Sequence, residues 1–299
     1  MKWSLATYTG QAATGLAALR EDGLLVGPAE LKRWSGLLDL LEDWPAAEKV
    51  LRAIDIMEAP EIAHDALLTP LRWPRKVICA GVNYHRHVLE MGGRPPGDGW
   101  KPFFFLRAPT TTLIGPNAPL ALRLREPARY DWEAELAVVI GLAGRDIPVA
   151  DALRHVAGYC VANDVTARAR HRRDEVPADA FSYDWFAAKS ADGTLPLGPG
   201  VTPAFLVPDP QDLRVRLWVN GELQQDESTA DMITPVAGLI AAASEVVTLE
   251  PGDVLISGTP AGVGAGRGLF LRHGDVVRTA IDGLGSLENT VETRPGRAV

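Results

Sequence analysis

The sequence predicts a strand-rich α+β protein rather than a doubly wound parallel sheet. After residue 75, short segments with the apolar or alternating pattern of β-strands outnumber stretches with helical periodicity. The helical stretches do not alternate regularly with the strands, as they would in a protein built from parallel βαβ units. The dipeptides Asn220-Gly221 and Asp282-Gly283 are typical of hairpin turns and indicate antiparallel pairing.

Residues 1–72 are expected to form a small N-terminal α/β domain. Its predicted elements are strands around residues 1–8 and 15–26 and helices near residues 28–41 and 45–58. The segment Pro70-Leu71-Arg72-Trp73-Pro74 marks the boundary, because each proline disfavours helix at the residue before it. Residues 73–299 are expected to form the second, catalytic domain.

The second domain contains most of the predicted strands. These are residues 76–81, 103–106, 135–141, 155–163, 213–220, 253–257 and 275–281. Helices are predicted at residues 84–91, 148–153, 164–172 and 234–244. The glycine- and proline-rich residues 91–100 are expected to form a mobile loop, and such loops beside a reaction site are often lids.

Composition excludes several functional classes. The chain is 46% hydrophobic with a formal net charge of -8, which argues against a general nucleic-acid binder. We find no long apolar segment near the N-terminus and no membrane span, so a cytoplasmic protein without a membrane partner is expected. Cys79 and Cys160 each lie in an apolar run, which favours buried structural thiols over catalytic ones.

The run Tyr130-Asp131-Trp132-Glu133-Ala134-Glu135 places carboxylates at alternate positions before an apolar strand. Side chains two residues apart share one face of an extended chain, so these carboxylates are expected side by side. A divalent cation is the simplest group to neutralise them, and oxygen ligands favour Mg²⁺, Mn²⁺ or Ca²⁺. The alternative is a solvated acidic edge strand.

His87 and Glu90 are three residues apart in a predicted helix and therefore lie on the same face. A carboxylate beside an imidazole fixes its tautomer and raises its basicity, as a base that activates water requires. The alternative is an ordinary surface contact.

Asp164 and Lys189 are further candidates. Asp164 follows an apolar strand, where it either caps a helix or adds a carboxylate to the cation site. Lys189 follows an aromatic cluster and either binds a substrate oxygen or extends its amine to solvent.

The glycine-rich residues 257–268 match neither a dinucleotide-binding motif nor a phosphate-binding P-loop. They are expected to form a turn that presents backbone N–H groups and the Thr259 hydroxyl to an anion. The chain has no nucleophile elbow and no paired C-x-x-C motif, which disfavours serine hydrolases and zinc sites.

Together these motifs resemble the fumarylacetoacetate hydrolase superfamily in order and approximate spacing over about residues 73–293. The matching motifs are Gly81-Val82-Asn83-Tyr84-x-x-His87-x-x-Glu90, Asp131-Trp132-Glu133-Ala134-Glu135-Leu136, Asn163-Asp164-Val165-Thr166-Ala167-Arg168, Lys189-Ser190 and Ser257-Gly258-Thr259-Pro260-x-Gly262-Val263-Gly264. The resemblance implies a mixed β-roll catalytic domain, a homodimer and one Mg²⁺, Mn²⁺ or Ca²⁺ per site.

The resemblance also implies roles for individual residues. The implied metal ligands are Glu133, Glu135 and Asp164, with Asp131 less certain. His87 with Glu90 would form the catalytic base, and Lys189, Gly258 and Thr259 would bind the substrate. Arg107 stands where family members often have a lysine and is a further substrate-binding candidate. Substrates would be small 2-oxo or 1,3-dicarbonyl acids that chelate the cation. The first hypothesis is a hydrolase that cleaves a carbon-carbon bond in an acylpyruvate-like or 2,4-dioxo acid.

Two other functions remain open. One is an isomerase or decarboxylase of a 2-hydroxy-dienedioate or related 2-oxo acid, and the other is a non-catalytic paralogue that binds metal and a carboxylate. Ala169, His171, Ala191 and Gly193 replace residues that many members share, which suggests a roomier pocket. The basic residues 170–173 either bind a second substrate carboxylate or form a solvated helix face.

Overall fold

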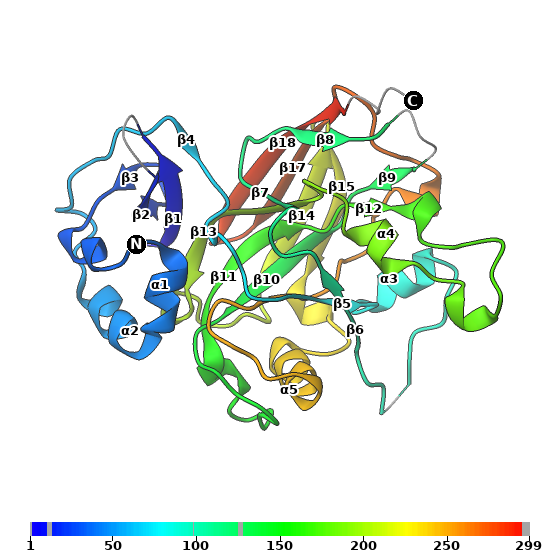
Figure 1. Ribbon diagram of the computed structural model, residues 1–299, viewed down its shortest axis with the longest axis horizontal. Coiled ribbons are helices and arrows are strands. Elements are labelled where there is room, and N and C mark those ends of the chain that lie inside the picture. The colour runs from blue at the N-terminus through cyan, green and yellow to red at the C-terminus, as the bar shows by residue number, and fades with distance from the viewer. Residues whose placement is uncertain (1, 11–13, 98, 125–127, 295–299) are drawn as a thin grey trace.

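The computed structural model describes residues 2–10, 14–97, 99–124 and 128–294 (Figure 1). Within these residues the strands form an eleven-stranded sheet, a five-stranded sheet and a two-stranded sheet. The large sheet has the order β3-β2-β1-β13-β11-β10-β16-β5-β6, with β4 paired to β1 and β7 paired to β13. The predicted strand-rich α+β class is confirmed.

The N-terminal elements lie at one side of the molecule (Figure 1). They are β1 (Trp3–Thr9), β2 (Thr14–Arg20), β3 (Leu25–Val26), α1 (Leu37–Glu42), α2 (Trp44–Ala53) and β4 (Ala66–Leu67). The predicted helix at residues 28–41 is shorter than expected. A 3-10 turn occupies Ala29–Arg33, and Ser35, just before α1, donates hydrogen bonds from its backbone N–H and its hydroxyl to Asp39 in the first turn of α1.

The N-terminal elements are joined directly to the rest of the chain. Strand β1 pairs antiparallel with β13 (Leu195–Pro203) at Leu5 and Val201, so the large sheet runs through both parts. Leucines of α1 also share a buried cluster with Val139 and Ile256 of the central strands. The division at residue 72 stays a prediction.

The remaining strands are β5 (Val77–Gly81), β6 (Phe103–Arg107), β7 (Leu113–Ile114), β8 (Leu120–Leu122), β9 (Tyr130–Asp131), β10 (Ala134–Ile140), β11 (Val156–Asn163), β12 (Thr166–Ala167), β14 (Arg214–Val219), β15 (Glu222–Ser228), β16 (Val254–Ile256), β17 (Val276–Ile281) and β18 (Gly285–Thr293). The helices are α3 (His85–Glu90), α4 (Trp185–Lys189) and α5 (Val236–Val246). Each strand predicted after residue 75 has a counterpart here. The five-stranded sheet has the order β15-β14-β17-β18-β8.

Both predicted hairpin turns are present. Asn220 and Gly221 have φ values of 52° and 82° between the paired residues Val219 and Glu222, as a type I′ turn requires. Asp282-Gly283 lies in the turn between β17 and β18, but that turn contains one residue more, because Ile281 pairs with Gly285.

Strand β10 lies at the centre of the core and is buried on both faces. Leu136, Val138 and Ile140 pack with the apolar residues of the five-stranded sheet. Ala137 and Val139 point the other way and pack with the N-terminal helices. By the same alternation, Glu135 lies on the face of β10 that carries Ala137 and Val139.

Two expectations about local structure were wrong, and one central strand was not predicted. Residues 148–153 do not form an α-helix, and only a 3-10 turn is present at Ala152–His155. Residues 164–172 form β12 and a 3-10 turn at Arg168–Arg170 instead of a helix, because Thr166 bonds back to the Asp164 carbonyl and pairs with Asp131 of β9. Strand β13 was not anticipated, since prolines are rare in central strands.

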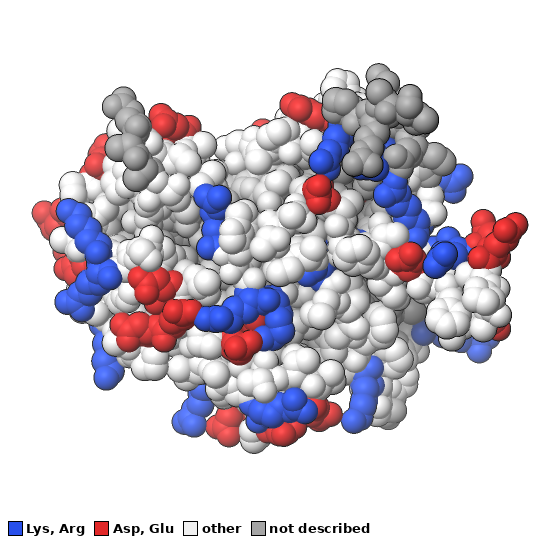
Figure 2. All heavy atoms as spheres, viewed as in Figure 1, with Lys and Arg blue, Asp and Glu red and all other residues white. Residues whose placement is uncertain are grey.

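The surface and the cysteines agree with the composition. On the face shown in Figure 2, acidic and basic side chains are interspersed. No helix among the described residues is long and apolar enough to cross a membrane. Cys79 and Cys160 are free and buried, and burial raises the pKa of both thiols, as expected of structural cysteines. In the predicted loop, residues 91–97 and 99–100 lack helix and strand, and Asp98 lies outside the described residues.

Candidate metal centre

Pairing of β10 with β11 brings the three predicted metal ligands together. Ala134 pairs with Asn163, so Glu133 and Glu135 flank the strand end that Asp164 follows. The Asp164 N–H donates to the Glu133 carbonyl at 2.8 Å, and the Asn163 side-chain oxygen accepts from the Glu133 N–H at 2.9 Å. One carboxylate oxygen from each of the three acids lies within 4.8 Å of the others, and all three acids are buried.

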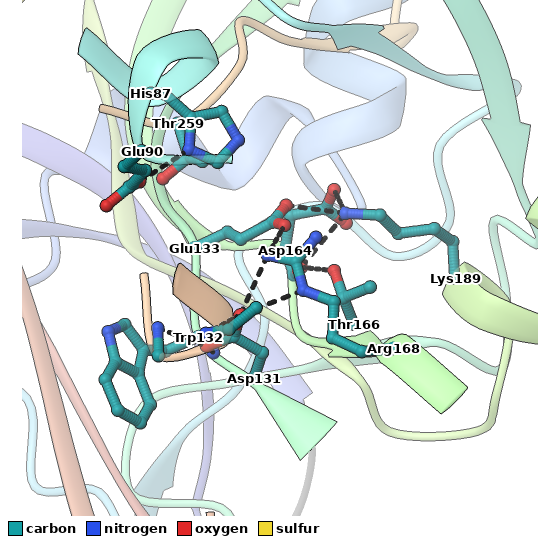
Figure 3. Close-up of polar contacts among 12 residues, drawn as sticks. His87, Glu90, Asp131, Trp132, Glu133, Asp164, Thr166, Arg168, Lys189 and Thr259 are labelled. Atoms are coloured by element: carbon teal, nitrogen blue, oxygen red, sulfur yellow. Dashed lines mark hydrogen bonds and ion pairs between the residues drawn. The ribbon is translucent and has the colours of Figure 1, made fainter. Parts of the chain in front are cut away.

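Three basic side chains surround these carboxylates. The Lys189 Nζ lies 2.6 Å from Glu133 Oε2 and 2.5 Å from Asp164 Oδ2. Arg107 donates to the other carboxylate oxygen of Asp164. Arg168 Nη2 lies 2.6 Å from Glu133 Oε1, and Figure 3 shows Glu133 contacted by both Lys189 and Arg168. The negative charge of Glu133 and Asp164 is therefore largely balanced within the protein.

Glu135 is the exception in this charge balance. Its Oε2 accepts a 2.5 Å hydrogen bond from the Gly258 N–H. Burial raises its pKa well above the usual range, and the charges of Asp164 and Glu133 raise it further. Burial also raises the pKa of Glu133, but Lys189 and Arg168 outweigh it and lower that pKa to about 2. Negative charge is thus in excess around Glu135.

The donor set fits a hard divalent cation. Three clustered carboxylates offer only oxygen ligands, the type that Mg²⁺, Mn²⁺ and Ca²⁺ prefer. Each carboxylate oxygen has more than one acceptor site, so contacts to Lys189 or Arg107 leave room for a further bond. The uncompensated charge near Glu135 supplies the electrostatic reason for such a cation to bind.

His87 and Glu90 form the expected pair on α3. The His87 Nδ1 lies 2.7 Å from Glu90 Oε1, and the Glu90 Oε2 accepts a 2.8 Å hydrogen bond from the Gly262 N–H. His87 is buried. Figure 3 shows the pair beside the carboxylates. This arrangement fixes the imidazole orientation next to the candidate cation site.

The segment before α3 is strained and tightly anchored. Val82 has a φ of 57°, a left-handed conformation that is costly for a β-branched residue. The next residue, Asn83, donates to the Ser257 carbonyl at 2.8 Å and accepts from the Thr234 N–H at 2.8 Å. Asn83 therefore fixes the start of the helix that positions His87, a role that sequence reasoning missed.

The glycine-rich turn binds carboxylates of the protein itself. Its Gly258 and Gly262 amides contact Glu135 and Glu90, and its Gly264 and Ala265 amides contact Asp131 at 2.7 and 3.0 Å. A side chain at Gly262 would place Cβ 2.0 Å from the Gln224 carbonyl, and its φ is 104°, so glycine is required. The turn therefore presents its N–H groups to anions as expected, but these anions are carboxylates of the protein itself.

Asp131 lies apart from the metal triad. The extended run breaks after β9, where Asp131 pairs with Thr166 of β12. Its carboxylate accepts from the Gly264 and Ala265 amides and from Arg168 Nε at 2.9 Å. The expected row of three adjacent carboxylates from the 131–135 run is therefore reduced to two, and Asp131 anchors the glycine-rich turn.

The predicted substrate-binding residues are engaged in internal contacts. Arg107 is 2% exposed and donates to Asp164 and to Thr194 Oγ1. The Thr259 hydroxyl donates to the Ala134 carbonyl at 3.0 Å and accepts from Gln225 Nε2 at 2.9 Å. Their contact with a substrate stays a prediction, as does that of Gly258.

Gln225 is a positioning residue that the sequence did not reveal. Its side-chain oxygen accepts from the Ala134 N–H at 2.9 Å, and its amide nitrogen also donates to the Pro260 carbonyl at 2.8 Å. Gln225, which is 91 residues from Ala134 in the sequence, thereby ties the start of β10 to the glycine-rich turn. No local pattern marks such a long-range contact.

Comparisons with known proteins identify the family. The family model of the fumarylacetoacetate (FAA) hydrolase C-terminal domain matches residues 76–292, so the chain belongs to this family. The chain is 41% identical over 228 residues to oxaloacetate tautomerase fahd2, mitochondrial, of Xenopus laevis, a match that covers 76% of this chain and 68% of that protein.

Solved structures show the same relationship. A fumarylacetoacetate hydrolase from Exiguobacterium antarcticum is 33% identical with a TM-score of 0.81, over 98% of this chain and 100% of that one. Fumarylpyruvate hydrolase from Pseudomonas aeruginosa, in complex with Mn²⁺ and pyruvate, is 32% identical with a TM-score of 0.66. This match covers 78% of this chain and 94% of that one. Proteins similar to this chain are thus enzymes that include a tautomerase and hydrolases.

The triad predicts divalent-cation binding that depends on Glu135. Glu135→Gln keeps the shape of the side chain but removes the charge, so the affinity for Mn²⁺ and Mg²⁺ should fall at least about tenfold in calorimetric titrations. Mn²⁺ should also raise the melting temperature of the wild type more than that of the variant. Glu222→Gln, at an exposed position of β15, is the matched control and should bind the ions as the wild type does. Equal affinity in all three proteins would contradict the assignment.

Asp131 should differ from the triad in its effect. Asp131→Asn removes the charge that holds Arg168 and the glycine-rich turn, so the free energy of unfolding should fall by roughly 3 kcal/mol in urea titrations. The affinity for Mn²⁺ should change much less than in Glu135→Gln. Asp146→Asn, whose side chain is 72% exposed, is the control for loss of an aspartate. A loss of Mn²⁺ affinity without loss of stability would instead make Asp131 a ligand.

Proposed function

We propose that this member of the fumarylacetoacetate hydrolase family catalyses proton transfer at the carbon beside the carbonyl of a small 2-oxo acid, interconverting keto and enol forms as in an oxaloacetate tautomerase. The observation that carries the proposal is the fixed His87–Glu90 pair, with a 2.7 Å contact, beside the carboxylate triad. The resemblance to the Xenopus laevis tautomerase supports it.

The triad would hold the ion on which this chemistry depends. Glu133, Glu135 and Asp164 are the proposed ligands, and Mg²⁺, Mn²⁺ or Ca²⁺ are the ions that suit them. Such an ion would act as a Lewis acid that makes the protons beside the 2-oxo group more acidic.

The protein side chains would move the proton. His87 would take the proton from C3, and Glu90 would stabilise the imidazolium that forms. Burial lowers the pKa of Lys189, but the charges of Asp164 and Glu133 outweigh it and raise the pKa, so Lys189 stays protonated. Its ammonium group already donates to Glu133 and Asp164, and it would give up the longest of these contacts, 3.3 Å to the Asp164 carbonyl, to donate to a substrate oxygen. Returning the proton from His87 to oxygen completes the conversion of ketone to enol.

Hydrolysis of an acylpyruvate is the second candidate. It is favoured by the similarity to the fumarylpyruvate hydrolase that was solved with Mn²⁺ and pyruvate. Here His87 would take a proton from water, and the hydroxide would attack the C4 carbonyl. The C3–C4 bond would break to release a carboxylic acid, and the pyruvate enolate would regain a proton at C3. Tautomerisation is placed first because it requires only the His87–Glu90 pair, whereas hydrolysis also requires a site for the attacking water.

The homodimer, the cytoplasmic location and the choice of ion are further parts of this proposal. They follow from the family resemblance and from the composition. The non-catalytic alternative is less favoured, because a protein that only binds a ligand has no need for the His87–Glu90 pair and its anchoring amide.

Product analysis in deuterated water separates the candidate reactions. With Mn²⁺ or Mg²⁺ and oxaloacetate, we expect faster keto–enol interconversion and faster exchange of the C3 protons, followed optically and by NMR of the quenched acid. With an acylpyruvate, hydrolysis would give two acids. Decarboxylation would release CO2. A metal-loaded protein that accelerates none of these reactions would overturn the catalytic proposal.

His87→Gln should lower kcat by about 10²- to 10⁴-fold with little change in KM, because the base acts on the transition state. The matched control is His85→Gln, an exposed histidine on the same helix, which should keep the wild-type kcat. Circular dichroism and Mn²⁺ titration of both variants exclude loss of fold or of cation binding as the cause. A similar kcat in the two variants would remove His87 from the mechanism.

A further inference from the structure

A row of aromatic rings leads from Lys189 toward the surface. We call Phe103, Phe105, His171, Tyr183 and Trp185 the aromatic row. The Lys189 ammonium lies 5.4 Å from the Phe105 ring centre, and the Phe105 and Trp185 centres are 4.8 Å apart with the rings nearly parallel. The His171 ring meets Trp185 edge-on at 4.1 Å, and Tyr183 follows at 5.3 Å.

The two ends of the row differ in exposure. Lys189, at the inner end, is 3% exposed, whereas Tyr183 and Phe103 at the outer end are 57% and 43% exposed. The row therefore connects a buried charged centre with solvent. Helix α4 provides both Trp185 and Lys189, and Asp184 caps it by accepting from the Ala187 N–H at 2.8 Å. The positions of Trp185 and Lys189 relative to each other are thus set by a single short helix.

His171 has an unused hydrogen-bonding atom. Its Nε2 is buried and has no partner in the protein, whereas nearly all buried polar atoms in folded proteins are paired. The residue itself is firmly held, since its N–H donates to the Arg168 carbonyl at 3.2 Å and its carbonyl accepts from the Asp184 N–H at 2.9 Å. A residue whose backbone is held on both sides and whose ring nitrogen has no partner in the protein is suited to bind a ligand.

The charge state of His171 indicates which ligand group it would bind. Burial lowers the pKa of His171, and the charges of Lys189 and Arg168 lower it further. The ring is therefore neutral at pH 7, with one donor and one acceptor nitrogen. A neutral imidazole suits a carbonyl or another uncharged polar group better than a carboxylate.

We call the 2-oxo acid group of a substrate its head and the substituent beyond that group its arm. We propose that His171 and the aromatic row determine specificity by binding the arm of a 2-oxo acid substrate, and that they favour a flat, conjugated arm such as an aryl or alkenyl ketone. The inference rests on the proposed function, because Lys189 at the inner end of the row is assigned to the 2-oxo acid head. It narrows the substrate class, since oxaloacetate has no such arm. Aromatic rings prefer stacked or edge-on contacts with flat groups, and His171 Nε2 supplies the hydrogen bond.

Unreactive probes with a common head group can test this inference. Oxamate has no arm, N-phenyloxamate has a flat aromatic arm, and N-oxalylglycine has an arm that ends in a carboxylate. We expect the Mn²⁺-loaded protein to bind N-phenyloxamate about tenfold more tightly than oxamate in calorimetric titrations, with N-oxalylglycine weaker than N-phenyloxamate.

Two variants locate the effect. His171→Phe keeps a ring but removes the nitrogen, and Trp185→Leu removes the ring against which His171 and Phe105 pack. In both, the ratio of the oxamate and N-phenyloxamate dissociation constants should fall toward one. His155→Gln should keep the wild-type ratio, since His155 contacts the Leu142 carbonyl at the other end of β11. Comparing ratios within one protein cancels general losses of folded material.

The outcomes distinguish the inference from the function on which it rests. If oxamate binds with Mn²⁺ but the ratio is unchanged in both variants, the inference is wrong and the proposed function stands. Tighter binding of N-oxalylglycine than of N-phenyloxamate would also overturn it, in favour of an arm with a second carboxylate. If none of the probes binds to the Mn²⁺-loaded protein, both the proposed function and the inference fail.

Discussion

The site depends on balancing several carboxylates in a place that water hardly reaches. Asp131, Glu133, Glu135 and Asp164 are each at most 5% exposed, and an unpaired buried carboxylate is costly. Three basic side chains offset most of this charge, but the acids exceed them by one. Glu135 carries the consequence, since its pKa is raised by burial and by its acidic neighbours. A doubly charged ion would reverse the sign of that excess, and a monoanionic substrate would then restore neutrality.

The glycine-rich turn holds several of these carboxylates in separate positions. Its backbone amides bind three carboxylates with different roles. Glu135 belongs to the metal triad, Glu90 pairs with His87, and Asp131 is a structural anchor. Gly262 is required for the turn to pass close to β15, because a Cβ at this position would lie 2.0 Å from the Gln224 carbonyl oxygen. The turn thus connects Glu90, which contacts His87, with the proposed metal ligand Glu135 through backbone hydrogen bonds.

Sequence reasoning succeeded where a local pattern has a direct spatial consequence. Period-two alternation correctly predicted that Glu133 and Glu135 lie close together, and α-helical spacing correctly predicted that Glu90 lies beside His87. It failed for contacts between distant segments, such as that of Gln225 with Ala134. It also failed at β13, where prolines and glycines concealed a central strand, and at Asp131, where an unforeseen pairing with β12 interrupted the row of carboxylates.

The same centre can serve several reactions because its rigid parts act only on the head of the substrate. The triad, Lys189 and His87 all lie where a 2-oxo acid would be bound, and none of them distinguishes loss of a proton from cleavage of a neighbouring bond. The difference must arise from what lies beyond the head. In this chain that region is aromatic, and His171 is its one anchored imidazole among the described residues. Under the proposed function, selection of the reaction would depend on the outer part of the site, whereas reactivity would depend on the buried carboxylates.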